Sequence, residues 1–200
     1  KEFPTLDIPM VCDMSSDIFS RNIDFSKFGI IYAGAQKNMG PAGTALVVVK
    51  EEILGKNGRT IPSMLDYAKH IKAESMYNTP PVFPVYASLL TLQWLKNLGG
   101  IPAIEKINNA KADLLYTEID RNPLFKGTAV VEDRSTMNAT FLLDTPLHTD
   151  TFNAMLKEAG VVGLPGHRSV GGYRASIYNA MPLESVQVLV DVMKDLENRV

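Results

Sequence analysis

The sequence predicts an α/β protein of two units, and three observations support this prediction. Short runs of apolar and β-branched residues alternate with longer segments of helical periodicity. A double glycine, Gly99-Gly100, separates two predicted helices and marks a boundary, so we expect units at residues 1–99 and 100–200. Of the 200 residues, 46% are hydrophobic and 21% are charged, with a net charge of −2. That composition suffices for a substantial core.

The same composition argues against several classes of protein. No apolar run is long enough for a transmembrane helix, and the small net charge disfavours bulk nucleic-acid binding. The single cysteine, Cys12, excludes an internal disulfide and a cysteine-rich metal site. The three histidines lie too far apart in sequence for metal-ligand spacing, so we expect no metal. We expect a soluble, cytoplasmic protein, since one free cysteine suits a reducing compartment.

In the first unit we expect strands near residues 8–12, 28–33 and 44–50. Sheets usually hold about five or six strands, so we infer that a preceding portion of the natural chain is missing. Residues 66–84 have an irregular pattern, and the paired prolines at its centre favour an extended, exposed backbone. Residues 85–98 are predicted to form a helix that is apolar around most of its circumference and therefore heavily buried.

The second unit begins with a predicted helix at residues 102–122 and continues as a small α/β domain. Strands are expected at 128–131, 138–143 and 173–178, and a further helix at 149–159. The last helix starts at Pro182, a residue favoured in the first turn. Its apolar residues fall on one stripe, which should face the core: Val186, Leu189, Val190, Met193 and Leu196.

Lys37 stands in a turn of small residues between two predicted buried strands, in the segment I-I-Y-A-G-A-Q-K-N-M-G-P-A-G at 30–43. A cation there must either reach solvent or have a chemical role, because burying an unpaired ammonium is costly. Partial desolvation would help the amine to lose its proton and attack an aldehyde cofactor. The plainer alternative is a turn lysine in solvent.

Asp13 ends the first predicted strand, and binding groups in open sheets lie at the carboxyl ends of strands. Pyridoxal phosphate accepts electrons only while its ring nitrogen stays protonated, which requires a facing carboxylate. Asp13 and Lys37 could serve one such pocket together. Taken alone, Asp13 could equally be a helix N-cap or a turn residue.

Four ordered motifs make the sequence resemble a known family. D-M-S-S-D-I-F-S-R-N-I-D at 13–24 and I-Y-A-G-A-Q-K-N-M-G-P-A-G at 31–43 resemble the cofactor-lysine region of phosphoserine aminotransferases. The similarity continues through Y-N-T-P-P at 77–81 and G-H-R-S-V-G-G-Y-R-A-S-I-Y-N-A at 166–180. This family belongs to the fold-type I pyridoxal-phosphate enzymes. The resemblance implies the remainder of a large domain with a mixed, mostly parallel sheet, followed by a small α/β domain.

The resemblance also implies roles for individual residues. Lys37 would form a Schiff base with the cofactor and move the substrate proton, and Asp13 would pair with the ring nitrogen. Gln36 would lie near the cofactor phosphate. Asn78 and Thr79 would reach the cofactor phosphate of a neighbouring subunit, which implies a homodimer with shared sites.

The glycine-rich segment near the carboxyl end would bind the substrates. Arg174 would hold the substrate α-carboxylate, a task suited to a planar bidentate donor. His167 and Arg168 would receive the phosphate of one substrate or the side-chain carboxylate of glutamate. The implied reaction is transamination between glutamate and 3-phosphohydroxypyruvate, giving O-phosphoserine and 2-oxoglutarate in serine biosynthesis. An exposed cationic loop is the alternative for this segment.

Two other readings of the whole chain are open from the sequence. Another fold-type I enzyme, such as an alanine-glyoxylate-type aminotransferase or a cysteine desulfurase-like protein, would keep Lys37 and Asp13 but act on a different substrate. A non-catalytic scaffold domain would leave Lys37 as a turn residue. The resemblance covers the carboxyl-terminal portion of the family, so we expect the 200 residues alone to bind cofactor poorly and to turn over little substrate.

Overall fold

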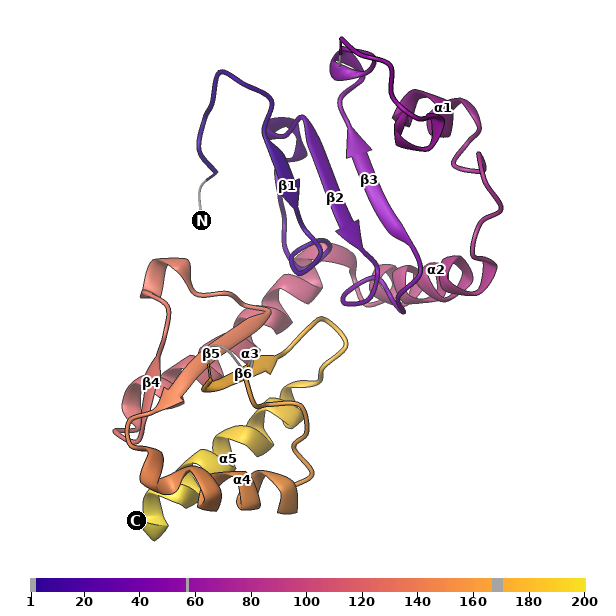
Figure 1. The fold of residues 1–200 in the computed structure, drawn as a ribbon. Helices are drawn as coiled ribbons and strands as arrows, with labels where there is room; N and C mark the ends of the chain where they lie inside the picture. Colours follow the sequence, from indigo (N-terminus) through magenta and orange to yellow (C-terminus); the bar gives the residue numbers. More distant parts are fainter. Residues whose placement is uncertain (1–2, 57, 167–170) are drawn as a thin grey trace. The chain divides into compact units, whose positions relative to one another are not determined.

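The computed structural model describes residues 3–56, 58–166 and 171–200. The chain folds as two compact units, one extending to Leu98 and the other running from Gly99 to Val200. Figure 1 labels the elements of both units, which are described here separately. Among the described residues, no helix combines the length and the apolar character needed to cross a membrane.

The first unit is organised on a three-stranded sheet of order β1-β2-β3. Strands β1 (Val11–Asp13) and β2 (Ile30–Gly34) are parallel, whereas β2 and β3 (Ala45–Val49) are antiparallel. One face of β2 is buried, because alternate residues of a strand point to the same side. This face packs in a small core whose buried members are Met14, Ile18, Phe28, Ile31, Ala33, Ala35 and Met39.

The helices of the first unit differ from expectation in three respects. The segment predicted as irregular contains helix α1 (Tyr67–Lys72), which Asp66 caps by accepting a hydrogen bond from the Ala68 N–H at 3.1 Å. Helix α2 (Val82–Asn97) starts earlier than predicted. The prediction that α2 is heavily buried is wrong for this unit, since only Ser88 and Leu95 are buried along it. Apolar composition alone does not specify which face finds a packing partner.

The second unit is an antiparallel sheet of order β4-β5-β6 with three helices. Strand β5 (Asn138–Leu143) pairs with β4 (Phe125–Gly127) and with β6 (Tyr173–Ser176). The helices are α3 (Gly100–Arg121), α4 (Thr149–Glu158) and α5 (Leu183–Arg199). Their apolar residues form one core with the buried face of the sheet, which contains Ala139, Phe141, Tyr173 and Ala175.

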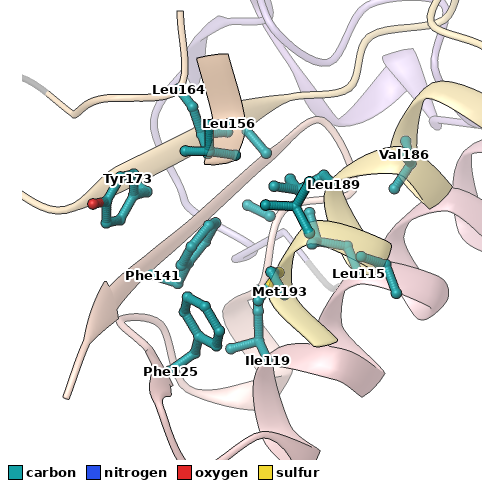
Figure 2. Packing of buried hydrophobic residues seen from close by; sticks show 14 of the residues in the cluster. Leu115, Ile119, Phe125, Phe141, Leu156, Leu164, Tyr173, Val186, Leu189 and Met193 are labelled. Carbon is teal, nitrogen blue, oxygen red and sulfur yellow. The ribbon is translucent and has the colours of Figure 1, made fainter. Parts of the chain in front are cut away.

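The aromatic residues at the centre of this core determine where β4 lies. The ring of Phe125 packs edge to face with Phe141 at 5.8 Å (Figure 2). It also packs edge to face with Phe152 at 5.2 Å. The strand predicted at residues 128–131 was misplaced: Val130 and Val131 are exposed there, and β4 lies at 125–127. The stripe predicted on the last helix is confirmed, because all five of its residues are buried.

One charged side chain, Lys111 of α3, lies wholly inside the second unit with 0% exposure. Its Nζ donates to the carbonyl oxygens of Ile177, Tyr178 and Met181 at 2.9, 2.8 and 3.1 Å. Burial lowers the pKa of Lys111 to about 8, while the three carbonyl dipoles favour the charged form. The buried ammonium thus fixes the turn between β6 and α5.

Candidate functional site

The candidate site of the first unit lies at the carboxyl ends of β1 and β2. Asp13 is the last residue of β1, and Lys37 follows the end of β2 by three residues. Because the two strands are parallel neighbours, their ends meet at one edge of the sheet. The turn after β2 is tight, since the Lys37 N–H donates to the Ala35 carbonyl at 2.7 Å. The structure therefore brings the predicted carboxylate and amine to one edge.

Hydrogen bonds join the turn after β1 to the turn after β2. The Gly34 N–H donates to Ser15 Oγ at 3.0 Å, and Lys37 Nζ donates to Ser16 Oγ at 2.5 Å. The buried Asn38 side chain donates to the Ile18 carbonyl at 3.1 Å. These bonds connect segments about twenty residues apart and hold the Lys37 loop against the Asp13 turn.

Asp13 is an exposed carboxylate in a setting that favours its charged form. Hydrogen bonds from the side chain and the backbone N–H of Ser15 lower the pKa of Asp13, with smaller contributions from Tyr32 and Lys37. The backbone bond, from Ser15 N to Asp13 Oδ1, is 2.8 Å long. Tyr32 is the register partner of Asp13 on β2, and the Asp13 charge raises the pKa of the Tyr32 phenol. Asp13 is therefore an anion at neutral pH.

The loop after Lys37 packs closely on the start of α2, which explains two of its glycines. Gly43 has φ +128°, and a Cβ there would lie 2.6 Å from Cγ of Pro84. Gly40 has φ +141°, and a Cβ would lie 3.3 Å from Oγ of Ser88. A side chain at either position would be strained by its backbone and crowded by α2. Figure 1 shows α2 beside the carboxyl ends of β1 and β2.

The remaining predicted residues of the first unit are placed differently. Gln36 is exposed beside Lys37, and its side chain folds so closely over Gly34 that a Cβ at position 34 would collide with it. Asn78 and Thr79 are exposed in the segment between α1 and α2, where Asn78 Nδ2 donates to the Thr79 carbonyl at 3.2 Å. Gln36 thus shares the edge with Asp13 and Lys37, whereas Asn78 and Thr79 lie on a separate segment.

Arg174 belongs to the second unit, on the exposed face of β6. The strand is anchored on both sides: the Arg174 N–H donates to the Leu164 carbonyl at 2.8 Å, and Arg174 pairs in register with Thr140 of β5. Its core-facing neighbour Tyr173 donates to Asn153 Oδ1 at 3.2 Å. The guanidinium is therefore presented from a firmly held strand. His167 and Arg168 lie outside the described residues.

The sequence pattern did not identify Ser15, Ser16 and Tyr32 as members of this edge. The run D-M-S-S-D resembles an ordinary cap, and the hydrogen bond from Ser15 to Asp13 is indeed a local turn contact. The bond between Ser16 and Lys37 spans 21 residues, which no local pattern reveals. For Tyr32 a signal existed, because alternation along β2 places it on the face opposite the core.

Comparisons with known proteins agree on one family. The family model described as aminotransferase class V matches residues 3–189. The phosphoserine aminotransferase of Flavobacterium johnsoniae is 81% identical over all 200 residues. In solved structures, the phosphoserine aminotransferase of Bacillus circulans subsp. alkalophilus is 43% identical with a TM-score of 0.94 over the whole chain. The PLP-bound phosphoserine aminotransferase of Trichomonas vaginalis is 38% identical with a TM-score of 0.91 over 97% of the chain.

The chain spans 56% of the length of each of these three relatives. The two structural matches cover nearly all of the chain at high TM-scores, which confirms the predicted α/β fold class of these fold-type I enzymes. The family match includes every candidate site residue that the sequence predicted, from Asp13 to Arg174.

Proposed function

The chain belongs to the class V aminotransferases, and from this premise we propose that the whole protein is a phosphoserine aminotransferase that uses pyridoxal 5'-phosphate. One observation carries the proposal: a charged carboxylate, Asp13, and a lysine amine, Lys37, are held at one sheet edge by hydrogen bonds between their turns. The identity of 81% to a phosphoserine aminotransferase supports this substrate class over other aminotransferases or a scaffold.

The residues at the edge fit this cofactor. Asp13 is an exposed anion of lowered pKa, as the protonated ring nitrogen requires. Lys37 is an amine on a tight loop beside it, and glycines at 40 and 43 keep that loop compact. When bound, pyridoxal phosphate supplies an electron-accepting ring that stabilises negative charge at the substrate α-carbon.

The chain's own residues would then orient the reactants and move protons. Asp13 would hold the proton on the ring nitrogen through a charge-assisted hydrogen bond. Lys37 Nζ would accept the proton from the substrate α-carbon and later donate it again. Gln36, exposed beside Lys37, is assigned to the cofactor phosphate.

The substrate residues complete the proposal. Arg174, on the exposed face of β6, binds the α-carboxylate common to glutamate and the phosphorylated keto acid. His167 and Arg168 are assigned to the substrate phosphate and to the side-chain carboxylate of glutamate. Asn78 and Thr79 are assigned to the cofactor of a neighbouring subunit, and this assignment requires a homodimer with shared sites. Their exposure in the described unit suits a residue pair that contacts a partner. The proposed compartment is the cytoplasm, which suits a chain with one free cysteine.

The test uses the full-length protein with Lys37→Ala and, as control, Lys27→Ala, which changes an exposed lysine of the same unit. We expect Lys37→Ala to lower transamination of 3-phosphohydroxypyruvate by about 100- to 10,000-fold, the usual contribution of a general base. It should also abolish borohydride-trapped attachment of the cofactor. Full activity in Lys37→Ala would refute the proposal.

A substrate panel tests the specificity separately. The full-length protein should prefer 3-phosphohydroxypyruvate to its unphosphorylated counterpart as amino acceptor. Equal rates for both would assign the protein to another branch of the family and would remove the role given to His167 and Arg168.

A further inference from the structure

Lys37 Nζ donates a hydrogen bond to Ser16 Oγ at 2.5 Å, and the proposed function gives this hydroxyl no role. Both residues are partly buried, so this contact is not a fully hydrated surface pair. Ser16 lies three residues after Asp13, and its turn therefore carries both the carboxylate and a partner for the lysine. The inference drawn from this contact rests on the function proposed above.

The position of the Ser16 hydroxyl is determined by its surroundings. The preceding residue, Ser15, accepts from the Gly34 N–H at 3.0 Å, which ties the turn to the end of β2. On the other side, Asn38 Nδ2 lies 3.5 Å from the Ser16 carbonyl and 3.1 Å from the Ile18 carbonyl. Asn38 itself is buried, with 4% exposure. These bonds flank the contact between Ser16 and Lys37 and limit how far Oγ can move.

A hydroxyl suits a lysine that changes its protonation state. It accepts a hydrogen bond from an ammonium and can donate one to a neutral amine. An alanine in the same place would leave the long lysine side chain free to sample many rotamers. Serine keeps a hydrogen-bond partner for the nitrogen in both states and so holds it in place.

We propose that Ser16 is a positioning residue that holds Nζ of Lys37 in attacking position whenever the lysine is not bonded to the cofactor. A free lysine side chain loses rotamer freedom when it reacts, and Ser16 removes much of that freedom in advance. The hydroxyl acts only through Lys37 and needs no contact with the reacting carbon. Its effect should therefore appear in the rate at which the protein captures the cofactor.

The experiment measures that rate in cofactor-free full-length protein. Pyridoxal 5'-phosphate is added, visible absorbance follows the reaction in which a carbon–nitrogen double bond forms and water leaves, and borohydride reduction with mass spectrometry locates the bond. We expect Ser16→Ala to slow capture about tenfold, the loss of one hydrogen bond to a charged group. Ser16→Thr, which keeps the hydroxyl, should remain within about twofold of wild type.

The matched control is Ser63→Ala, which removes a comparable contact in the same unit, from Lys69 Nζ to Ser63 Oγ at 2.6 Å on an exposed surface. This variant should capture the cofactor at the wild-type rate. If wild type captures the cofactor and Ser16→Ala captures it at the same rate, the inference is overturned and the proposed function stands. Failure of wild type to capture the cofactor at Lys37 would instead refute the proposed function.

Folding of the variants is checked by far-ultraviolet circular dichroism. If Ser16→Ala does not fold, the comparison moves to Ser16→Cys, which keeps the size of the side chain but is a poor hydrogen-bond acceptor. Ser16→Cys should also be slow, and a wild-type capture rate in that variant overturns the inference.

Discussion

Replacing Lys111 with methionine should destabilise the second unit, because the carbonyl oxygens of Ile177, Tyr178 and Met181 would lose the buried lysine donor that they share. The Lys111 side chain has 0% exposure, and its Nζ contacts the carbonyls of Ile177, Tyr178 and Met181 at 2.8 to 3.1 Å. Methionine has a similar length but donates no hydrogen bond. The change therefore removes the donors with little change in packing volume.

The magnitude follows from two opposing contributions. Each buried acceptor left without a donor costs about 1–3 kcal/mol. Removing the ammonium also removes the cost of desolvating it, which amounts to several kcal/mol in protein interiors and offsets part of the loss. We expect a net decrease of about 3 kcal/mol in the free energy of unfolding, because the lost hydrogen bonds outweigh the desolvation cost that is removed.

Hydrogen exchange of the full-length protein, read by mass spectrometry over residues 173–181, measures this effect where it arises. About 3 kcal/mol corresponds to exchange roughly a hundred times faster, since each 1.4 kcal/mol is a factor of ten. The control is Lys106→Met, an exposed lysine on the same helix, which should change stability by less than about 0.5 kcal/mol. Unchanged exchange in Lys111→Met would show that these hydrogen bonds contribute nothing and would refute the reasoning.

Two further predictions concern charge. Burial lowers the pKa of Lys111 to about 8 from 10.5, so the unfolded chain binds more protons than the folded chain between these pH values. The unfolding free energy of wild type relative to Lys111→Met should therefore rise as the pH increases from 8 to 10.5, by at most about 3 kcal/mol. Urea titrations across this range measure that difference, and a difference that stayed flat or fell would contradict the assignment. Asp13→Asn keeps the turn acceptor but removes the charge, so the full-length protein should bind pyridoxal phosphate with a changed absorption spectrum and lose transamination by about 100-fold or more. Asp24→Asn, whose carboxylate makes the same type of turn bond to the Ser26 N–H at 3.0 Å, should leave both measurements unchanged.

Periodicity predicted the elements whose own residues carry their packing pattern. The stripe on α5 is the clearest case, because every third or fourth residue is apolar and each of these residues is buried. Strand β5 was also predicted at its observed bounds, since Asn138–Leu143 alternates between buried and less buried positions. Where the pattern was weaker, the prediction was wrong: Val130 and Val131 have high strand propensity but are exposed, and β4 forms earlier around Phe125.

Helix α2 shows the limit of composition. Its residues are apolar around most of the circumference, which predicted burial, yet in the described unit Trp94 is 41% exposed and Phe83 is 73% exposed. The contacts that do form are with the loop after Lys37, where Pro84 and Ser88 lie against glycines 43 and 40. Burial of a helix depends on which other segments pack against it, whereas hydropathy describes only the residues of the helix itself.

For the candidate site, the sequence by itself predicted the chemistry and the tertiary structure decided the contacts. The residue types, the ends of predicted strands and the resemblance of four motifs identified Asp13 and Lys37 as a pair. Only the folded chain brought Ser16 to Lys37 across 21 residues, and Lys111 to carbonyls 66 to 70 residues away. Periodicity and capping depend on neighbours within a turn or two, whereas these bonds depend on how distant segments pack. A serine in a cap-like run and a lysine inside a helix therefore gave no local sign of the partners they meet.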